Sequence, residues 1–287
     1  MARRKVGAME ERREIMGKIL DEAKPAEEMK RESYLLKTLI CSESGGGKTT
    51  GAALTLPKPV LLLDYDNRAQ SVVGFEGIDV IPCFEADSRS PKAWDRAENI
   101  RKEIWVAVRG GTFKYASVLE DGLSSLNRIC MNWALLLDPK RGLGGSPAKQ
   151  HYGLHIKNLA DHILSMIALP VHYCLTGHFN LTEDEETGAH KYLPKIYGKQ
   201  ARTDVPTWFD ECYLAYHKTD EKEHRERYYW HTAGFGRYEF FKSTLNQLGK
   251  FWKNPVEVDL EESPAGFEKL LELRFGEEGK VKDEDIK

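Results

Sequence analysis

The chain has 287 residues, with 42 Lys and Arg against 45 Asp and Glu, and this formal net charge of −3 excludes a uniformly basic nucleic-acid-binding surface. Its length allows one large α/β domain with extensions or two modest domains, and five scattered cysteines without a C-x-x-C pair indicate neither a disulfide framework nor a zinc ribbon. Because no apolar run is long enough to cross a bilayer and residues 1–5 lead into a charged segment, we expect a cytoplasmic protein without membrane contact.

The first segment is predicted to form a charged helix over residues 9–30, in which Met16, Ile19 and Ala23 recur at three- and four-residue steps. Such a narrow apolar stripe packs on the helix's own domain or docks on a neighbouring subunit. We therefore divide the chain into an N-terminal helical extension (1–31), a core (32–250) and a C-terminal part (251–287). The last part holds one short amphipathic helix and a mixed-charge tail that we expect to be disordered.

The core opens with an apolar run over residues 35–41, a glycine-rich loop and a stretch of helical character. The order strand, glycine loop, helix binds phosphate, because backbone N–H groups surround the anion at the positive end of the helix. Lys48 is expected to contact the β- and γ-phosphates and the Thr49 hydroxyl to contact Mg²⁺. An ordinary glycine turn is the alternative, and Ser42 stands where the phosphate-loop pattern has Gly. The predicted nucleotide-binding residues are Ser44, Gly45, Gly46, Gly47, Lys48, Thr49 and Thr50.

Two later apolar runs, which are predicted to be buried strands, end in acidic residues. Asp66 follows the run over 60–63, where open α/β sheets place their ligands, so it is a candidate general base for an attacking water. Capping of a turn is an equally good interpretation of Asp66. Asp121 ends the second run, over 115–121, and is the candidate magnesium residue opposite Thr49. Glu120 points to the other side of the strand by alternation.

A Gly- and Pro-rich stretch over 138–149 is predicted to be a loop, and Lys140, Arg141 and Lys149 make it basic. Three histidines on the following helix (His151, His155 and His162) lie near one face. No matching carboxylate or cysteine set accompanies them, so we expect exposed or capping histidines and no metal site. The next strand, over 171–176, ends at His178, which is placed to hydrogen-bond a γ-phosphate.

Residues 179–206 alternate basic and aromatic side chains around an acidic turn. Such a pattern is typical of segments that follow a phosphate backbone and stack bases, while a solvated hairpin is the competing interpretation. Together with the 138–149 loop, the candidate DNA-binding residues are Lys140, Arg141, Lys149, Lys191, Lys195, Lys199 and Arg202.

The end of the core is predicted to contain antiparallel strands over 205–216, 225–231 and 238–241 at a sheet edge. Arg237 and Lys242 flank the last of them. Both cations are candidates for contact with a nucleotide bound to a neighbouring subunit, although surface cations are the ordinary explanation.

Over residues 34–245 this order of elements resembles the RecA-like ATPase core, most closely the compact phage-encoded RecA-like ATPases linked to single-strand annealing and recombination. The segments that carry the resemblance are Ser-Gly-Gly-Gly-Lys-Thr-Thr, Lys-Pro-Val-Leu-Leu-Leu-Asp-Tyr-Asp, Ser-Val-Leu-Glu-Asp-Gly, Leu-Thr-Gly-His and Trp-Phe-Asp-Glu-Cys-Tyr-Leu. The implied fold is α/β, a P-loop NTPase core with a mainly parallel sheet flanked by helices and antiparallel strands at its C-terminal edge.

The resemblance also implies roles for the candidate residues. Lys48 and Thr49 hold phosphate and magnesium, Asp121 is the Walker B residue and His178 is the γ-phosphate sensor. Asp66 takes the place usually held by a catalytic Glu, and Lys242 matches a basic finger that acts across a subunit interface. The loops 138–150 and 179–204 correspond to the family's two DNA-binding loops.

We therefore expect a Mg²⁺-dependent ATP hydrolase that forms a homo-oligomeric ring or filament and couples turnover to single-stranded DNA. The implied setting is phage DNA recombination, annealing or replication in the bacterial host cytoplasm, with a single-strand-binding or recombination protein as a further partner. Two alternatives stay open at this point. A nucleotide or small-molecule kinase would yield a phosphorylated acceptor, and a nucleotide-gated binding or structural protein would bind ATP with little turnover.

Overall fold

The computed structural model describes residues 34–138, 145–183 and 188–276. The chain divides into two units at Tyr34, and everything below concerns the second unit. The predicted helix over 9–30, the predicted tail beyond 276, and the candidates Lys140 and Arg141 lie outside the described residues.

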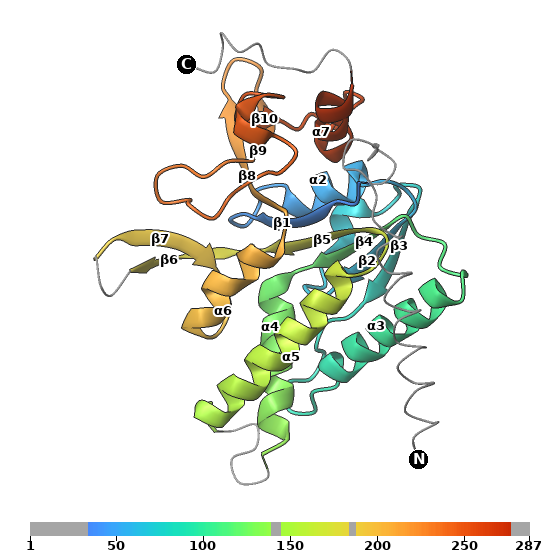
Figure 1. Ribbon diagram of the computed structural model, residues 1–287, viewed down its shortest axis with the longest axis vertical. Helices are drawn as coiled ribbons and strands as arrows, with labels where there is room; N and C mark the ends of the chain where they lie inside the picture. Colours follow the sequence, from blue (N-terminus) through green and yellow to red (C-terminus); the bar gives the residue numbers. More distant parts are fainter. Residues whose placement is uncertain (1–33, 139–144, 184–187, 277–287) are drawn as a thin grey trace, which may run out of the picture. The chain divides into compact units, whose positions relative to one another are not determined.

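A single eight-stranded sheet organises the unit, in the order β10-β9-β8-β1-β5-β4-β2-β3 (Figure 1). The six strands from β8 to β3 run parallel, while β9 and β10 are added antiparallel at the edge beside β8. This arrangement confirms the predicted fold class. The strands are β1 (Lys37–Cys41), β2 (Val60–Asp64), β3 (Ile78–Pro82), β4 (Ser117–Asp121), β5 (His172–Gly177), β8 (Glu211–Asp220), β9 (Arg225–His231) and β10 (Val256–Glu257).

Helices cover both faces of this sheet (Figure 1). One face carries α2 (Lys48–Thr55) and α7 (Gly266–Phe275), and the other carries α3 (Ala93–Arg109), α4 (Leu123–Leu136) and α5 (Lys149–Ile167). A separate hairpin of β6 (Phe179–Glu183) and β7 (His190–Pro194) extends away from the sheet beside α6 (Lys199–Asp204). The 3₁₀ turns are η3 (Ala69–Val72), η4 (Val205–Trp208) and η5 (Gln247–Gly249).

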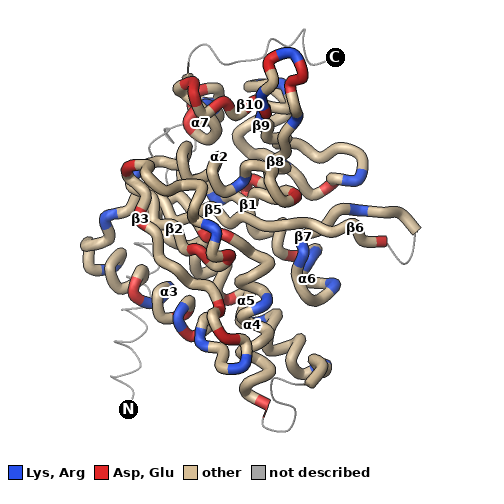
Figure 2. Tube along the Cα trace, turned by 180° about the vertical axis from the view of Figure 1, so that it is seen from behind, with Lys and Arg blue, Asp and Glu red and all other residues tan. Residues whose placement is uncertain are grey.

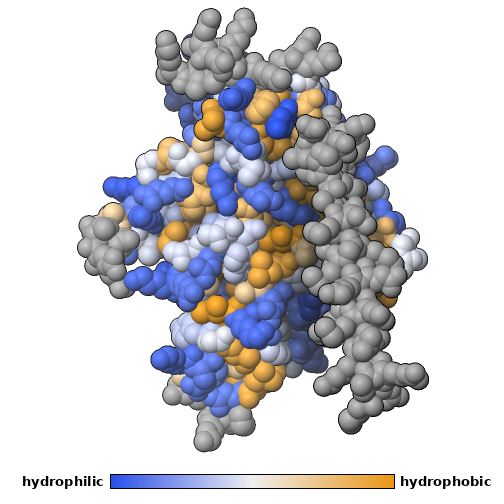
Figure 3. Space-filling model, in the orientation of Figure 1, coloured by the Kyte–Doolittle hydropathy of each residue, from blue (hydrophilic) through white to orange (hydrophobic). Residues whose placement is uncertain are grey.

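Double-sided coverage explains the composition of the central strands. Every residue of β1, β2 and β4 is buried, as expected for parallel strands that have helices on both faces. The C-terminal helix α7 belongs to the same core, because its Phe267 is fully buried against Tyr213 and Trp230. Among the described residues no helix is long and apolar enough to cross a membrane. On the face that Figure 3 shows, small apolar areas are divided by polar ones.

Two local predictions were wrong. Residues 205–208 form the turn η4, and the strand begins only at Glu211. The predicted strand over 238–241 is irregular, with isolated bridges that join Phe235 to Tyr238 and Cys212 to Lys242. Helix α3 begins at Ala93, where the Glu85 carboxylate accepts the Lys92 and Ala93 N–H groups.

A buried ionic network lies under β4 on the α5 side. Glu120 is fully buried and accepts hydrogen bonds from the Tyr65 and Tyr173 hydroxyls at 2.9 and 2.5 Å. The two ring nitrogens of His162 lie 2.9 Å from Glu120 Oε1 and 2.8 Å from Glu98 Oε1. Both carboxylates accept, so both nitrogens donate and the ring is an imidazolium.

The three α5 histidines are buried, so of the two predicted roles the exposed one is wrong. His151 does cap its helix, because its Nδ1 accepts the Ala148 N–H, and His155 is fully buried. Within the described ranges no group of three or more His, Cys, Asp or Glu is arranged to hold a metal ion.

This network predicts a pH dependence of stability. Burial alone would lower the pKa of His162, but the carboxylates of Glu120 and Glu98 raise it to about 9. A pKa above the unfolded value stabilises the fold fully below about pH 6.5 and progressively less as pH rises toward 9. We expect the free energy of unfolding to fall between pH 6.5 and 8 by up to about 1.4 kcal/mol per pH unit, measured by urea denaturation.

The control is His162→Gln, which cannot carry the charge. Whatever its absolute stability, its unfolding free energy should show a clearly smaller decrease over the same pH range. Equal slopes in the two proteins would contradict the ion pair.

Candidate functional site

The loop between β1 and α2 shows why its glycines are required. Gly45 has a φ of +84°, a conformation that side chains other than Gly rarely adopt. A Cβ on Gly46 would lie 2.7 Å from Ser42 Cβ. Ser42 itself does not have a positive φ; it is buried, and its N–H donates to Gly177 O at 3.1 Å. Ser42 therefore continues the β1–β5 pairing, and the positive φ that the loop needs falls on later residues.

Gly47 is constrained from two sides. It is the N-cap of α2 with a φ of +75°, and a Cβ there would lie 2.5 Å from Cδ1 of Tyr228 on β9. The tyrosine ring thus lies directly against the loop at the start of the helix. No substitution at Gly47 avoids both the backbone strain and the clash.

A cavity of about 290 Å³ adjoins this loop and the first turn of α2. The helix begins at Lys48, so its free N–H groups and the positive end of its dipole favour an anion here. Arg68 and Ser71 from the segment after β2 also line the cavity, together with Tyr228 and Trp230 of β9. The cavity is therefore suited to a phosphorylated ligand that has an apolar or aromatic part.

Asp121 is buried at the end of β4 and receives two hydroxyl donors. Thr49 Oγ1 donates to Asp121 Oδ1 at 2.9 Å, and the Thr176 hydroxyl of β5 donates to the same oxygen. Burial raises the pKa of Asp121, and the Lys48 ammonium and the two hydroxyls oppose this. A hydroxyl and a carboxylate oxygen in contact at the mouth of a phosphate loop form the oxygen donor set that Mg²⁺ prefers, so Thr49 and Asp121 fit that ion.

The two acids at the C-terminal end of β2, Asp64 and Asp66, have different tasks. The Asp64 carboxylate is buried and accepts backbone N–H groups from Asp66, Arg68 and Ala69, so it stabilises the turn. Asp66 is free of that role and lies next to Asp121, because a Cβ on Gly122 would be 3.1 Å from Asp66 Oδ2. The turn function that sequence reasoning allowed for Asp66 therefore belongs to Asp64.

His178 lies beside the loop from the end of β5. Its Nδ1 is 3.0 Å from Ser42 O, and because a carbonyl only accepts, Nδ1 carries the proton. Burial and then the nearby Lys48 ammonium lower the pKa of His178, so the free ring is neutral at pH 7 with Nε2 as an acceptor. Donation from Nε2 to a phosphate requires a second proton, which an adjacent anion favours.

The structure thus brings Lys48, Thr49, Asp66, Asp121 and His178 together around the loop. Arg237 and Lys242 are separate from them. The Arg237 carbonyl accepts the Tyr192 N–H beside the β6–β7 hairpin, and Lys242 pairs through its backbone with Cys212 on β8. Their role across a subunit interface remains a prediction.

Sequence comparison agrees with this geometry: the profile of the AAA domain family matches residues 35–236 of the 287-residue chain. The chain belongs to the AAA domain family. A search of curated proteins gives no match. The matched region is a P-loop ATPase domain of the AAA type and runs from β1 to the turn after β9. It ends just before Arg237 and Lys242, so membership of the AAA domain family carries no information about these two cations.

Sequence reasoning missed Thr176, Arg68 and Tyr228. Thr176 precedes Gly177 and His178 in a strand-end motif, so its position at the sheet edge was a usable signal. Tyr228 gave none, because its contact with Gly47 depends on pairing between β8 and β9 far along the chain.

The Gly47 contact predicts the outcome of Gly47→Ala. Left-handed backbone costs about 1–2 kcal/mol for a residue with a Cβ, and the added methyl also displaces Tyr228. We expect at least a tenfold loss of affinity for a fluorescent ATP analogue.

Gly153→Ala is the matched control, because Gly153 lies in α5 with a normal φ and nothing within 4 Å of a built Cβ. It should bind nucleotide normally and be equally or more stable. Equal binding by both variants would exclude the proposed tight contact at Gly47.

Proposed function

We propose that the protein is a Mg²⁺-dependent ATP hydrolase whose turnover is coupled to single-stranded DNA. The observation that carries the hydrolase part is the 2.9 Å contact between Thr49 and Asp121 at the start of α2, with Asp66 beside it. Phosphoryl transfer needs positioning and charge stabilisation more than covalent chemistry, and these groups supply both.

Each residue of the site has a proposed task. The loop N–H groups and the Lys48 ammonium bind the β- and γ-phosphates, while Thr49 and Asp121 hold Mg²⁺. The ion, when bound, neutralises charge on the phosphate oxygens. Asp66 orients or deprotonates the attacking water, for which a carboxylate within hydrogen-bond reach is required. The negative charge of a bound γ-phosphate favours protonation of His178. The ring then donates from Nε2 to the phosphate and from Nδ1 to Ser42 O, so it links the phosphate to the loop.

The role of Lys48 predicts the effect of Lys48→Ala. Removal of the ammonium takes away charge stabilisation at the transferring phosphoryl group, so ATP hydrolysis should fall to background. Released phosphate is the readout. Lys102→Ala, which changes an exposed lysine on α3, should retain full activity. Unchanged turnover in Lys48→Ala would refute the assignment.

The DNA part rests on where the predicted basic residues lie. Three of them, Lys191, Lys199 and Arg202, line one cleft of about 380 Å³ between the β6–β7 hairpin, α6 and the segment 239–240. Figure 2 shows the positive charges of β7 and α6 on neighbouring segments. Lys191 is also paired with Glu239 at 2.9 Å, and Tyr192 lines the same cleft. Cations beside an aromatic ring are suited to a single strand.

Self-assembly completes the proposal. Arg237 and Lys242 are exposed, and both are separate from the phosphate loop of their own subunit. In a homo-oligomeric ring or filament they are available to a neighbour's nucleotide, as an arginine or lysine finger requires. A role in phage DNA recombination, annealing or replication belongs to this proposal and rests on the resemblance alone.

DNA coupling predicts that single-stranded oligonucleotide raises the rate of ATP hydrolysis, and that this stimulation weakens as salt increases. In Lys199→Ala the slope of log affinity against log salt should become less steep by about 0.7, the value for one lost phosphate contact. Anisotropy of a labelled oligonucleotide measures the affinity, and Lys102→Ala is the control. No binding at low salt, with a DNA-independent rate, would refute the coupling.

A further inference from the structure

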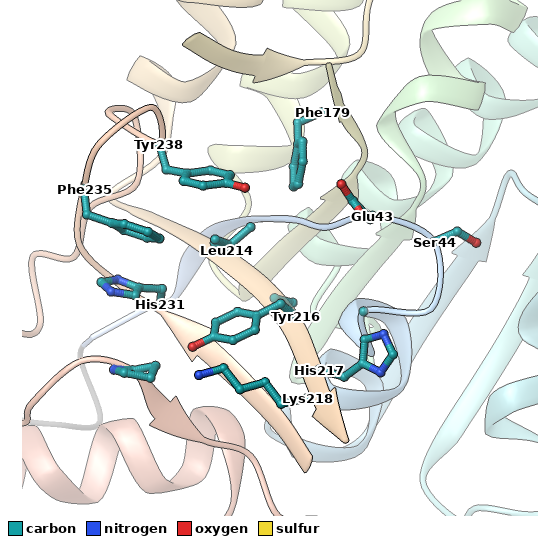
Figure 4. A pocket seen from close by; sticks show the side chains of 13 residues that line it. Glu43, Ser44, Phe179, Leu214, Tyr216, His217, Lys218, His231, Phe235 and Tyr238 are labelled. Carbon is teal, nitrogen blue, oxygen red and sulfur yellow. The ribbon is translucent and has the colours of Figure 1, made fainter. Parts of the chain in front are cut away.

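A second and larger cavity, of about 560 Å³, lies next to the phosphate loop. It shares Ser44 and Gly46 with the nucleotide cavity but is otherwise lined by different residues. Figure 4 shows aromatic side chains that converge on it from several segments of the chain. The aromatic rings that line it belong to Phe179, Tyr216, His217, His231, Phe235 and Tyr238.

The β8–β9 hairpin contributes side chains to both cavities. Side chains alternate along a strand, and the register pairs Ala215 with Trp230 and Tyr216 with Tyr229. One face of the hairpin therefore presents Tyr228 and Trp230 toward the nucleotide cavity or the core. The other face presents Leu214, Tyr216, Lys218 and His231 to the second cavity, which Ala215 and His217 of β8 also line.

The aromatic surface is organised, yet it is open to a ligand. Phe235 stacks on His231 with 4.1 Å between ring centroids, and Tyr216 stacks on Tyr229 at 5.5 Å. Phe235 nevertheless stays 41% exposed, and its ring faces the cavity (Figure 4). Preformed rings with a free face bind flat apolar groups at low entropic cost.

Two charged side chains indicate which flat group fits. The Lys218 ammonium lies 5.7 Å from the ring centroids of both Tyr216 and Tyr229, at the rim formed by β8. Glu43 also lines the cavity, and its carboxylate repels a phosphate but accepts N–H donors. The cavity therefore suits a base with an exocyclic amino group whose phosphate lies near Lys218.

Two stacked tyrosines connect the wall of this cavity to that of the basic cleft at the hairpin. Tyr192 of the basic cleft stacks on Tyr238 of the second cavity, with 4.4 Å between centroids and 5° between planes. The Tyr192 N–H also donates to Arg237 O at 2.9 Å, which fixes the two segments together. A strand held by Lys191, Lys199 and Arg202 thus meets the aromatic cavity next.

We infer that this cavity receives an unstacked base of single-stranded nucleic acid, and that it favours the bases with an exocyclic amino group, which are cytosine, adenine and guanine, over thymine. Phe235, Tyr216 and Tyr238 stack on the base, and Glu43 accepts its amino hydrogen, which thymine lacks. The inference rests on the proposed coupling to single-stranded DNA. It adds the site at which a base touches the loop that also holds the ATP phosphates.

The first experiment compares Phe235→Ala with Phe84→Ala, an equally exposed phenylalanine at 38% exposure outside the cavity. Anisotropy of labelled oligo-dC and oligo-dT at low salt measures affinity, and a fluorescent ATP analogue measures nucleotide binding. We expect Phe235→Ala to weaken oligo-dC binding roughly 5- to 100-fold, the range for one lost stacking contact, while ATP binding is unchanged. Phe84→Ala should match the unmodified protein.

The second experiment uses Glu43→Met, which keeps the length of the side chain but removes both acceptor oxygens. The unmodified protein should prefer oligo-dC to oligo-dT by about tenfold, as expected for one specific hydrogen-bonded contact. In Glu43→Met that preference should fall toward one, with little change for oligo-dT.

The outcomes separate this inference from the proposed function. If the unmodified protein binds no oligonucleotide, the DNA coupling itself is refuted and the base site with it. If it binds DNA but Phe235→Ala binds equally well, only the base site is overturned. A changed oligomeric state of Phe235→Ala in sedimentation, with normal DNA binding, would instead assign the cavity to a protein interface and overturn the inference.

Discussion

The hydrogen bond from Thr49 to Asp121 is the contact on which the site depends, because it joins the first turn of α2 to the end of β4. Strands β1 and β4 are not neighbours; β5 lies between them and supplies the Thr176 hydroxyl to the same carboxylate. A buried carboxylate is costly without partners. Two segments, α2 and β5, therefore donate to one dehydrated charge on β4, and this places the phosphate loop, His178 and Asp66 at one edge of the sheet.

Two consecutive acids on a fully buried strand would be unfavourable if they shared one environment. Alternation along β4 prevents this, since Asp121 faces the loop while Glu120 faces α5 and the His162 imidazolium. The ion pair of Glu120 and His162 also helps to hold the site in place. Glu120 accepts the Tyr65 hydroxyl, and Tyr65 immediately precedes Asp66, so the network under the sheet restrains the backbone that carries the candidate base.

The antiparallel hairpin β8–β9 gives the phosphate loop different neighbours on its two sides. Tyr228 packs on Gly47 from one side of the loop, and the cavity with Phe235 and Tyr238 opens on the other. Both cavities share Ser44 and Gly46, so a ligand in either contacts the same short segment. A shared loop gives the two ligands a direct way to influence each other. When one ligand binds, it restricts the conformations of the loop residues that the other ligand contacts.

The sequence by itself determined the features that depend on neighbours along the chain. Local patterns and periodicity predict the phosphate loop with Lys48 and Thr49 and the buried strands that end in Asp64 and Asp121. They also predict that Glu120 and Asp121 point to opposite faces of their strand. Partners far apart in the chain were decided only by the tertiary structure. Strand order and register decide three such features. They are the turn role of Asp64 instead of Asp66, the His162–Glu120 ion pair and the contact of Tyr228 with Gly47. A period-2 or period-3.6 pattern specifies which face is buried and not what lies against it.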